Sequence, residues 1–251
     1  MPILHSHLNT GTNRSLSITL AQNAGEVREA QKLRYQVFGE EMGARLESSS
    51  EGIDRDMFDA YCDHLLVRDN QSGEVIGTYR ILPPDAAKRI GGYYSDNEFD
   101  LTRLMHIRNR TAEVGRSCVH PGYRTGGTIT MLWAGLAQYM RKNNYDYLIG
   151  CASISMADGG HVAASLYSEI EKKYLSPIEW RVRPRCALPL ETLNTNLSPT
   201  PEMPPLIKGY LRLGAYVGGE PAWDPDFNTA DLFILLPMAR MNPRYLKHFL
   251  G

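Results

Sequence analysis

The sequence predicts an α/β fold in which helices cover a mixed central sheet. Between residues 111 and 174, an apolar strand, an apolar helix, a second apolar strand and a second helix follow one another. This order is typical of a parallel or mixed sheet with helices on its faces. Before it, residues 15–39 have the pattern of a strand and an amphipathic helix, and residues 64–82 that of a β-hairpin.

Side-chain periodicity supports the elements of the first half. Residues 15–21, "SLSITLA", alternate apolar and polar side chains as a half-buried strand does. Apolar side chains recur at helical spacing from Val27 to Val37 and predict a helix that ends near Gly39. Within the hairpin, the Asn-Gln-Ser-Gly sequence at 70–73 favours a tight reversal between two apolar runs.

The second half continues in the same way after an irregular stretch. Residues 83–110 show no clear period, apart from a short helix at 84–90. We then expect strands at 111–120, 145–154 and 230–239, and helices at 125–144, 159–174 and 204–215. We expect a flexible leader over residues 1–14 and a single domain over residues 15–251 whose C-terminal region is extended.

Composition excludes several classes of protein. A hydrophobic content of 43% in 251 residues supports a sizeable core, and the balance of 27 Lys and Arg against 28 Asp and Glu argues against bulk capture of nucleic acid. No apolar run reaches the length of a membrane-spanning helix. The four cysteines lack Cys-x-x-Cys spacing, so we expect reduced thiols and no metal site.

A glycine-rich turn precedes the predicted helix at 125–144. Gly126 and Gly127 lack Cβ atoms, so the backbone here can approach a ligand closely, and the amides at a helix start favour an anion. Arg124 adds a charged donor beside them. The alternative is that the glycines only shape a tight strand-to-helix turn.

Glu113 stands at the start of an otherwise apolar strand. A carboxylate in that position is costly unless it is paired or functional. One hypothesis is a general base whose pKa is raised by partial burial; the other is a salt bridge to Arg80 or Arg116. In a regular strand Glu113 and Arg116, three residues apart, point to opposite faces unless the strand is bulged.

An acidic loop and two cysteines are further candidates. Asp54, Asp56, Asp59 and Asp63 lack the glycine and terminal glutamate of an EF-hand. They therefore indicate either a solvated loop or a charge network with nearby arginines around a polar substrate. Cysteines in apolar strands are usually core residues, so neither Cys118 nor Cys151 is expected to be a nucleophile.

Together these segments resemble the Gcn5-related N-acyltransferases. The turn "VHPGYRTGGT" is similar to their pantetheine-binding motif. The segments "LRYQVF", "DAYCDHLLV", "GTYRIL", "YYSDNEFDL", "EVGRSCVHPGYRTGGTITMLWAGLAQYM" and "PPLIKGYLRLGAYVG" look like those of bacterial L-ornithine N-acyltransferases and N-acyl amino acid synthases. A weaker similarity links the chain to acyl-homoserine lactone synthases.

The resemblance implies a role for each group of residues. Glu113 would act as the base, and the backbone around Ser117, Cys118 and Val119 would polarise the thioester carbonyl. The amino acid and acyl entrance would be framed by Arg34, Phe38, Asp56, Asp59, Arg80 and Arg116. The donor arm would lie along Val119, Arg124, Thr125, Gly126 and Gly127.

The resemblance also implies the donor and the partners. A 3-hydroxyacyl group would arrive on the phosphopantetheine of acyl carrier protein, with no tightly bound cofactor, and would be transferred to the α-amino group of an amino acid, ornithine being favoured. Ile129 stands where coenzyme A users usually have Gly or Ala. We expect a cytoplasmic protein, with peripheral inner-membrane contact as an open alternative.

Three other functions remain open from the sequence. An acyl-homoserine lactone synthase is the nearest enzymatic rival. A coenzyme A-dependent acetyltransferase of small amines would use a different donor. A carrier-protein-binding or lipid-binding module would lack turnover, but the joint presence of Glu113, Arg80 and Arg116 argues against it, because a protein that only binds needs no base at the thioester.

Overall fold

A computed structural model describes residues 7–10, 14–124 and 126–241 of the chain. The chain divides into two compact units, each described here by itself. Unit 1 comprises residues 1–86, 114–144 and 244–251, and unit 2 comprises residues 87–113 and 145–243. Every helix within the described residues is too short or too polar to span a bilayer.

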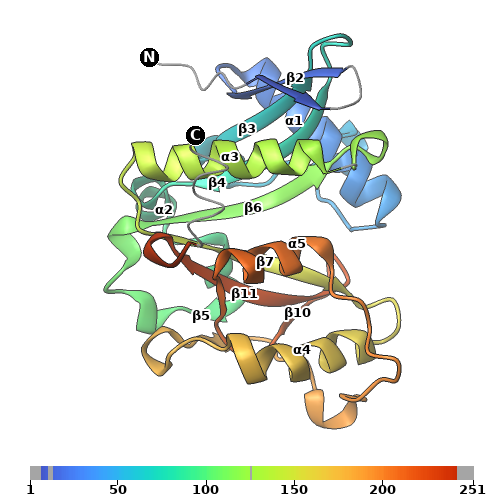
Figure 1. The fold of residues 1–251 in the computed structure, drawn as a ribbon, viewed down its shortest axis with the longest axis vertical. Helices are drawn as coiled ribbons and strands as arrows, with labels where there is room; N and C mark the ends of the chain where they lie inside the picture. The colour runs from blue at the N-terminus through green and yellow to red at the C-terminus, as the bar shows by residue number, and fades with distance from the viewer. Residues whose placement is uncertain (1–6, 11–13, 125, 242–251) are drawn as a thin grey trace. The chain divides into compact units, whose positions relative to one another are not determined.

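Unit 1 contains an antiparallel sheet with helices packed against it (Figure 1). Its hydrogen-bonded order is β1-β2-β3-β4-β6, and β6 begins in unit 2. Helix α1 runs on directly into a π-helical turn, so the helix predicted from Val27 to Gly39 is confirmed as a helical segment. The elements are β1 (His7–Thr10), β2 (Arg14–Leu20), α1 (Ala24–Arg34), the π-helix Tyr35–Glu41, β3 (Asp63–Asp69), β4 (Val75–Leu82), β6 (Thr111–Val119) and α3 (Gly127–Lys142).

The predicted hairpin is formed by β3 and β4, and its register contains a shift. Val67 pairs with Gly77 and Arg68 with Val75, so one residue of β4 is extra at this point. A Cβ on Gly77 would lie 2.6 Å from Cγ2 of Thr128 on α3. A glycine is therefore needed here for α3 to pack closely on the sheet.

Unit 2 is built around the long strands β7 and β11, which pair antiparallel along their whole length. Thr111–Glu113 of β6 pair in parallel with β7, and this parallel pair makes the topology mixed, as predicted. The elements of this unit are β5 (Phe99–Asp100), β7 (Tyr147–Ser155), α4 (His161–Tyr174), β8 (Arg183–Pro184), α5 (Pro205–Leu213), β9 (Tyr216–Val217), β10 (Ala222–Asp224) and β11 (Thr229–Pro237), while α2 (Pro84–Ile90) begins at its boundary.

Several short elements were not expected. Strands β5, β8, β9 and β10 have two or three residues each, too few to show alternation. Residues 7–10 of the expected leader form β1, while 1–6 and 11–13 lie outside the described residues. The structure also contains 3-10 turns at Ser49–Glu51, Asp59–Tyr61, Tyr94–Asp96, Thr102–Leu104, Arg108–Arg110, Pro121–Tyr123, Ile178–Trp180, Leu190–Thr192 and Met238–Arg240.

Candidate active site

Glu113 is buried on β6, with 4% of its surface exposed, and its carboxylate is held by three donors. The backbone N–H of Tyr94 donates to Oε2 at 2.6 Å, and the N–H and hydroxyl of Ser95 donate to Oε1 at 2.8 and 2.5 Å. Donors of this kind fix the orientation of a carboxylate and favour its ionised form. The carboxylate of Glu113 is therefore held in one orientation by the turn at residues 94–96.

The 3-10 turn that supplies these donors is itself tied down. The hydroxyl of Tyr93 lies 2.7 Å from the carbonyl oxygen of Thr111, two residues before Glu113 on β6. Asp96 accepts from the N–H of Tyr93 at 2.7 Å and pairs with Arg108 at 2.6 Å. Burial raises the pKa of Tyr93, so this hydroxyl stays protonated and can donate. Residues 93–96 show no periodicity in the sequence, because their structure depends on contacts with β6.

Arg34 forms the centre of a buried charge network in unit 1. Its side chain is 0% exposed and its guanidinium contacts Asp54 at 2.7 Å and Asp59 at 2.7 and 2.9 Å. Burial opposes ionisation of Asp59, but the hydrogen bond and charge of Arg34, with the charge of Arg80, outweigh it and hold its pKa well below its usual range. Because the guanidinium is occupied by two carboxylates, we interpret Arg34 as a residue that positions the loop.

Asp56 joins the same network at its more exposed side. Arg80 contacts Asp56 at 2.6 Å, and Arg116 contacts Asp54 at 3.2 Å and Asp56 at 3.3 Å. Asp56 and Arg116 keep 19% and 12% of their side chains exposed, so a solute could reach this part of the network. Phe38 packs nearby against the buried cluster of Leu33, Val37 and Cys118. The sequence hypothesis of a charge network, rather than a calcium loop, fits these contacts.

Strand β6 is irregular where the sequence placed the carbonyl-polarising backbone. Arg116 has a φ of 50°, a left-handed conformation that is uncommon outside glycine. This residue directly precedes Ser117, Cys118 and Val119, so the regular alternation of side chains along β6 is interrupted there. The spacing of Glu113 and Arg116 predicts opposite faces for the two side chains unless the strand is bulged. The interruption is consistent with such a bulge.

The glycine-rich turn leads into α3, and Arg124 is engaged there. Gly126 caps the helix with a φ of 99°, and Gly127 is its first residue. The guanidinium of Arg124 makes two 2.6 Å hydrogen bonds to Glu41 and one of 3.0 Å to the carbonyl oxygen of Val119. Thr125 lies outside the described residues. A donor phosphate at Arg124 would therefore have to displace Glu41.

Cys118 has the properties of a core residue. It is 6% exposed, and burial raises the pKa of its thiol to about 12, so it is protonated at neutral pH. The Cys118→Ala variant should therefore keep its kcat/KM within about threefold, because only the backbone of residue 118 is assigned a role, and lose on the order of 1 kcal/mol of stability. Steady-state kinetics and urea unfolding measure both quantities. A loss of activity beyond tenfold at intact fold would assign chemistry to the thiol.

A second group of polar side chains in unit 2 was not predicted. Glu98, Cys151 and Asp231 bring a carboxyl oxygen, a thiol and a second carboxyl oxygen within 4.8 Å of one another. The sequence indicated a core position for Cys151 and no role for Asp231 or Glu98. The sequence did contain a signal for Asp231, because it is a carboxylate within the apolar strand "ADLFILLP". The same kind of position indicated Glu113.

Comparison with known proteins gives similarity over nearly the whole chain. A family model described as an acetyltransferase (GNAT) domain matches residues 33–134. Proteins named L-ornithine N(alpha)-acyltransferase from Brucella abortus (strain 2308) and Agrobacterium fabrum (strain C58) are each 39% identical, over 94% of this chain and 89% and 86% of theirs.

A solved structure extends the comparison to the fold. FeeM, described as an N-acyl amino acid synthase from uncultured soil microbes, superposes with a TM-score of 0.57 at 13% identity, covering 96% of this chain and all of that one. At this identity the likeness concerns the fold. The predicted Gcn5-related N-acyltransferase fold, a mixed sheet flanked by helices, is confirmed.

Proposed function

We propose that this acyltransferase, which belongs to the family of the L-ornithine N(alpha)-acyltransferases, transfers a fatty acyl group to the α-amino group of ornithine. The observation that carries the proposal is 39% identity across 94% of the chain. A match of that extent includes both units, and with them the buried Glu113 and the glycine-rich turn. The product of this reaction would be lyso-ornithine lipid.

In the proposed reaction the chemistry centres on strand β6. Glu113 takes a proton from the α-ammonium group, directly or through water, and the resulting amine attacks the thioester carbonyl. Backbone amides around Ser117 to Val119 stabilise the developing oxyanion. A C–N bond forms as the C–S bond breaks, and the thiolate leaves and takes up a proton. Transfer is direct, so no acyl-enzyme forms.

The proposed donor is an acyl chain on the phosphopantetheine of acyl carrier protein. Its phosphate would lie at the start of α3, near Arg124, Gly126 and Gly127, where helix amides favour an anion. Val119 and Thr125 belong to the same proposed donor segment. The side chains of Arg124 and Glu41 are each about 40% exposed, and an exposed ion pair contributes little stability. A phosphate can therefore replace Glu41 as the partner of Arg124.

Replacing Glu41 tests this exchange. The Glu41→Gln variant should lower the KM for the acyl carrier protein donor by about two- to fivefold at unchanged kcat, because Arg124 no longer has to leave a carboxylate. Arg124→Ala should raise that KM. The matched control is Glu40→Gln, which removes the same charge one residue away; equal KM values for the Glu41 and Glu40 variants would place the phosphate elsewhere.

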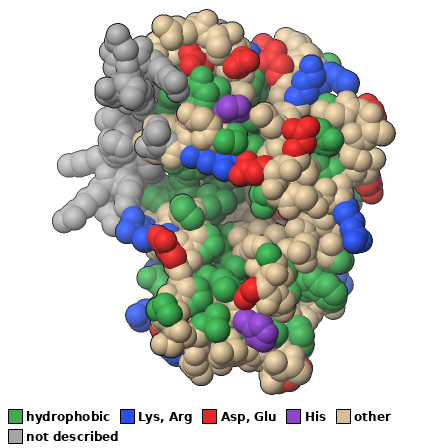
Figure 2. Space-filling view, turned by 90° about the vertical axis from the view of Figure 1, so that its right-hand side faces the viewer, with side chains coloured by type: hydrophobic (Ala, Val, Ile, Leu, Met, Phe, Trp, Pro, Cys, Tyr) green, Lys and Arg blue, Asp and Glu red, His purple; other side chains and the backbone are tan. Residues whose placement is uncertain are grey.

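Acyl carrier proteins are acidic, so docking needs basic side chains. Figure 2 shows Lys and Arg side chains scattered among acidic and hydrophobic ones on one face of the molecule. Several basic side chains that could contribute, those of Arg108, Arg110 and Lys172, are already paired with Asp96, Asp146 and Glu169. We therefore propose that docking depends on a few contacts near the donor turn. The acylated product has a long chain and a charged head, which supports peripheral contact with the inner membrane.

Release of carrier thiol tests whether the chain turns over its donor. Purified enzyme with 3-hydroxyacyl carrier protein and ornithine should release free thiol, measured with a thiol-reactive dye, and much less with acetyl-coenzyme A. Ornithine-independent binding of the carrier protein without thiol release would instead indicate a binding module. Turnover restricted to acetyl-coenzyme A would indicate an acetyltransferase of small amines.

A further inference from the structure

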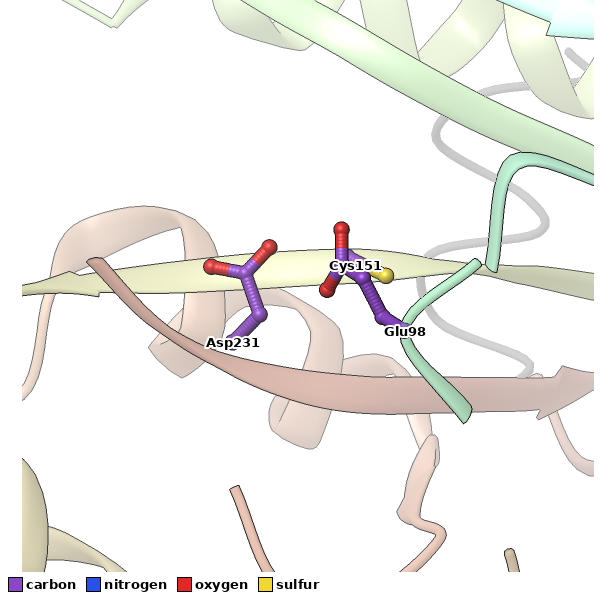
Figure 3. Close-up of side chains that lie close together, drawn as sticks. All are labelled: Glu98, Cys151 and Asp231. Atoms are coloured by element: carbon purple, nitrogen blue, oxygen red, sulfur yellow. The ribbon is translucent and has the colours of Figure 1, made fainter. Parts of the chain in front are cut away.

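The side chains of Glu98, Cys151 and Asp231 converge over the β7–β11 pair of unit 2 (Figure 3). Asp231 on β11 lies directly opposite Ser153 on β7 in the strand register, and Cys151 is two residues further along the same face of β7. Glu98 comes from the turn just before β5. Three segments distant in the sequence therefore place two carboxyl groups together.

The two carboxyl groups lack a cation among the described residues. Both oxygens of Glu98 are buried, and its carboxyl group interacts with Asp231 and with the Cys151 thiol, whereas Asp231, 4% exposed, is also within 2.9 Å of the Thr229 hydroxyl. Within the described ranges, no ion pair involves either residue. A buried carboxyl group without a counter-charge is costly, so this pair is not explained by stability.

The protonation of the pair follows from its surroundings. Burial, followed by the charges of Asp231 and Asp224, raises the pKa of Glu98 to about 9. The pKa of Asp231 is also raised, chiefly by burial. At neutral pH the pair therefore retains a proton on Glu98. A cation bound beside the two carboxyl groups would favour their ionised forms.

The pair is connected to the proposed base, and one exposed residue lies beside it on β7. The hydroxyl of Ser95 donates to Glu113 at 2.5 Å and lies 3.4 Å from the sulfur of Cys151. One small side chain thus contacts both the base and the cluster. Ser153, on the same face of β7, is exposed, so a solute can approach the cluster along this strand.

We propose that Glu98 and Asp231 bind the side-chain ammonium group of the amino acid acceptor while Glu113 acts on its α-amino group, an inference that rests on the proposed function. Ornithine carries a second ammonium group, separated from the α-carbon by three methylene groups. Its N–H donors satisfy the oxygens of Glu98, and its charge balances that of the pair. Glu98 and Asp231 would then determine specificity for a cationic acceptor.

The inference predicts strong discrimination against a neutral acceptor. Norvaline has the same carbon chain as ornithine but lacks the terminal ammonium, and it would leave the buried pair unbalanced. Sites that bind a polar substrate group through buried partners reject the analogue that lacks it. Wild-type enzyme should therefore prefer ornithine over norvaline by about 100-fold or more in kcat/KM.

The test compares both acceptors in Glu98→Gln and Asp231→Asn. Each variant should raise the KM for ornithine by about 30-fold and leave kcat/KM for norvaline within about threefold. Thermal melting checks that both fold. The matched control is Asp226→Asn, an exposed acid in the β10–β11 turn, which should change neither value. An unchanged ornithine preference in both variants would overturn the inference.

Calorimetric titration of the enzyme without donor separates this inference from the proposed function. Wild type should bind ornithine more tightly than norvaline, and Glu98→Gln should lose that difference; this result supports the subsite even if no acyl transfer occurs. Equal binding of both amino acids by wild type would overturn it. So would tight binding of Zn²⁺ that is lost in Glu98→Gln, without an ornithine preference, since the group would then be a metal site.

Discussion

The Glu113→Gln variant should lose about 100-fold or more in kcat, because without a base no group takes the proton of the substrate α-ammonium. The amide keeps the size of the side chain, so binding of the donor should change little. Any remaining rate should rise about tenfold per pH unit below the pKa of the amine, because only the fraction already deprotonated reacts. Stopped assays of product against pH measure both effects.

Thermal melting and two further variants separate a loss of catalysis from a loss of folding. In Glu113→Gln the new amide group would face donors from Tyr94 and Ser95, so thermal melting must accompany the kinetics. Glu113→Asp keeps the charge and shortens its reach, and should be intermediate. Ser95→Ala removes one donor but leaves the carboxylate, and should cost only a few-fold. A Glu113→Gln enzyme that is folded and nearly as active as wild type would refute the assignment.

The Arg34→Met variant should lose about 3–5 kcal/mol of stability. Its guanidinium is fully buried between Asp54 and Asp59, and removing it leaves two carboxylates in the interior without their cation. Urea unfolding measures the loss. The control is Arg55→Met in the same loop, where a half-exposed arginine pairs with Glu51 and should contribute less than about 1 kcal/mol. Equal losses for both variants would contradict the structural role.

The same network gives stability a pH dependence of known sign. The folded-state pKa of Asp59 is lowered, so its stabilisation is present above the unfolded-state value of about 3.9 and is lost as the pH falls toward the folded-state value. Unfolding free energies of wild type should therefore fall below about pH 4. Where Arg34→Met is too unstable, Asp59→Asn should show a weaker fall over the same range.

Periodicity was sufficient to predict the long elements, because their side chains alternate or recur along the sequence itself. The strands at 15–21 and 230–239, the hairpin and the helix preceding Gly39 match the structure closely. Short strands such as β9 and β10 form through pairing with β11 and with other segments distant in the sequence. The left-handed conformation of Arg116 was similarly hidden, since local sequence does not favour it.

Some residues of the candidate site could be predicted from the sequence and others could not. A lone carboxylate in an apolar strand pointed to Glu113, and the same rule would have pointed to Asp231. The ion pair of Glu41 with Arg124 could not be predicted, because the two residues are 83 positions apart and nothing in the local sequence distinguishes Glu41 from other surface acids. The network of Arg34 with Asp54 and Asp59 likewise depends on contacts across 20 and 25 positions.

Acyl transfer from a carrier protein to ornithine can be detected by mass spectrometry of the product. Purified enzyme is incubated with 3-hydroxyacyl carrier protein and an equimolar pool of amino acids that includes ornithine. We expect N-acyl-ornithine as the main product, acylated at the α-amino group. An acyl-homoserine lactone formed when S-adenosylmethionine is added, or no N-acyl amino acid with any acceptor, would contradict it.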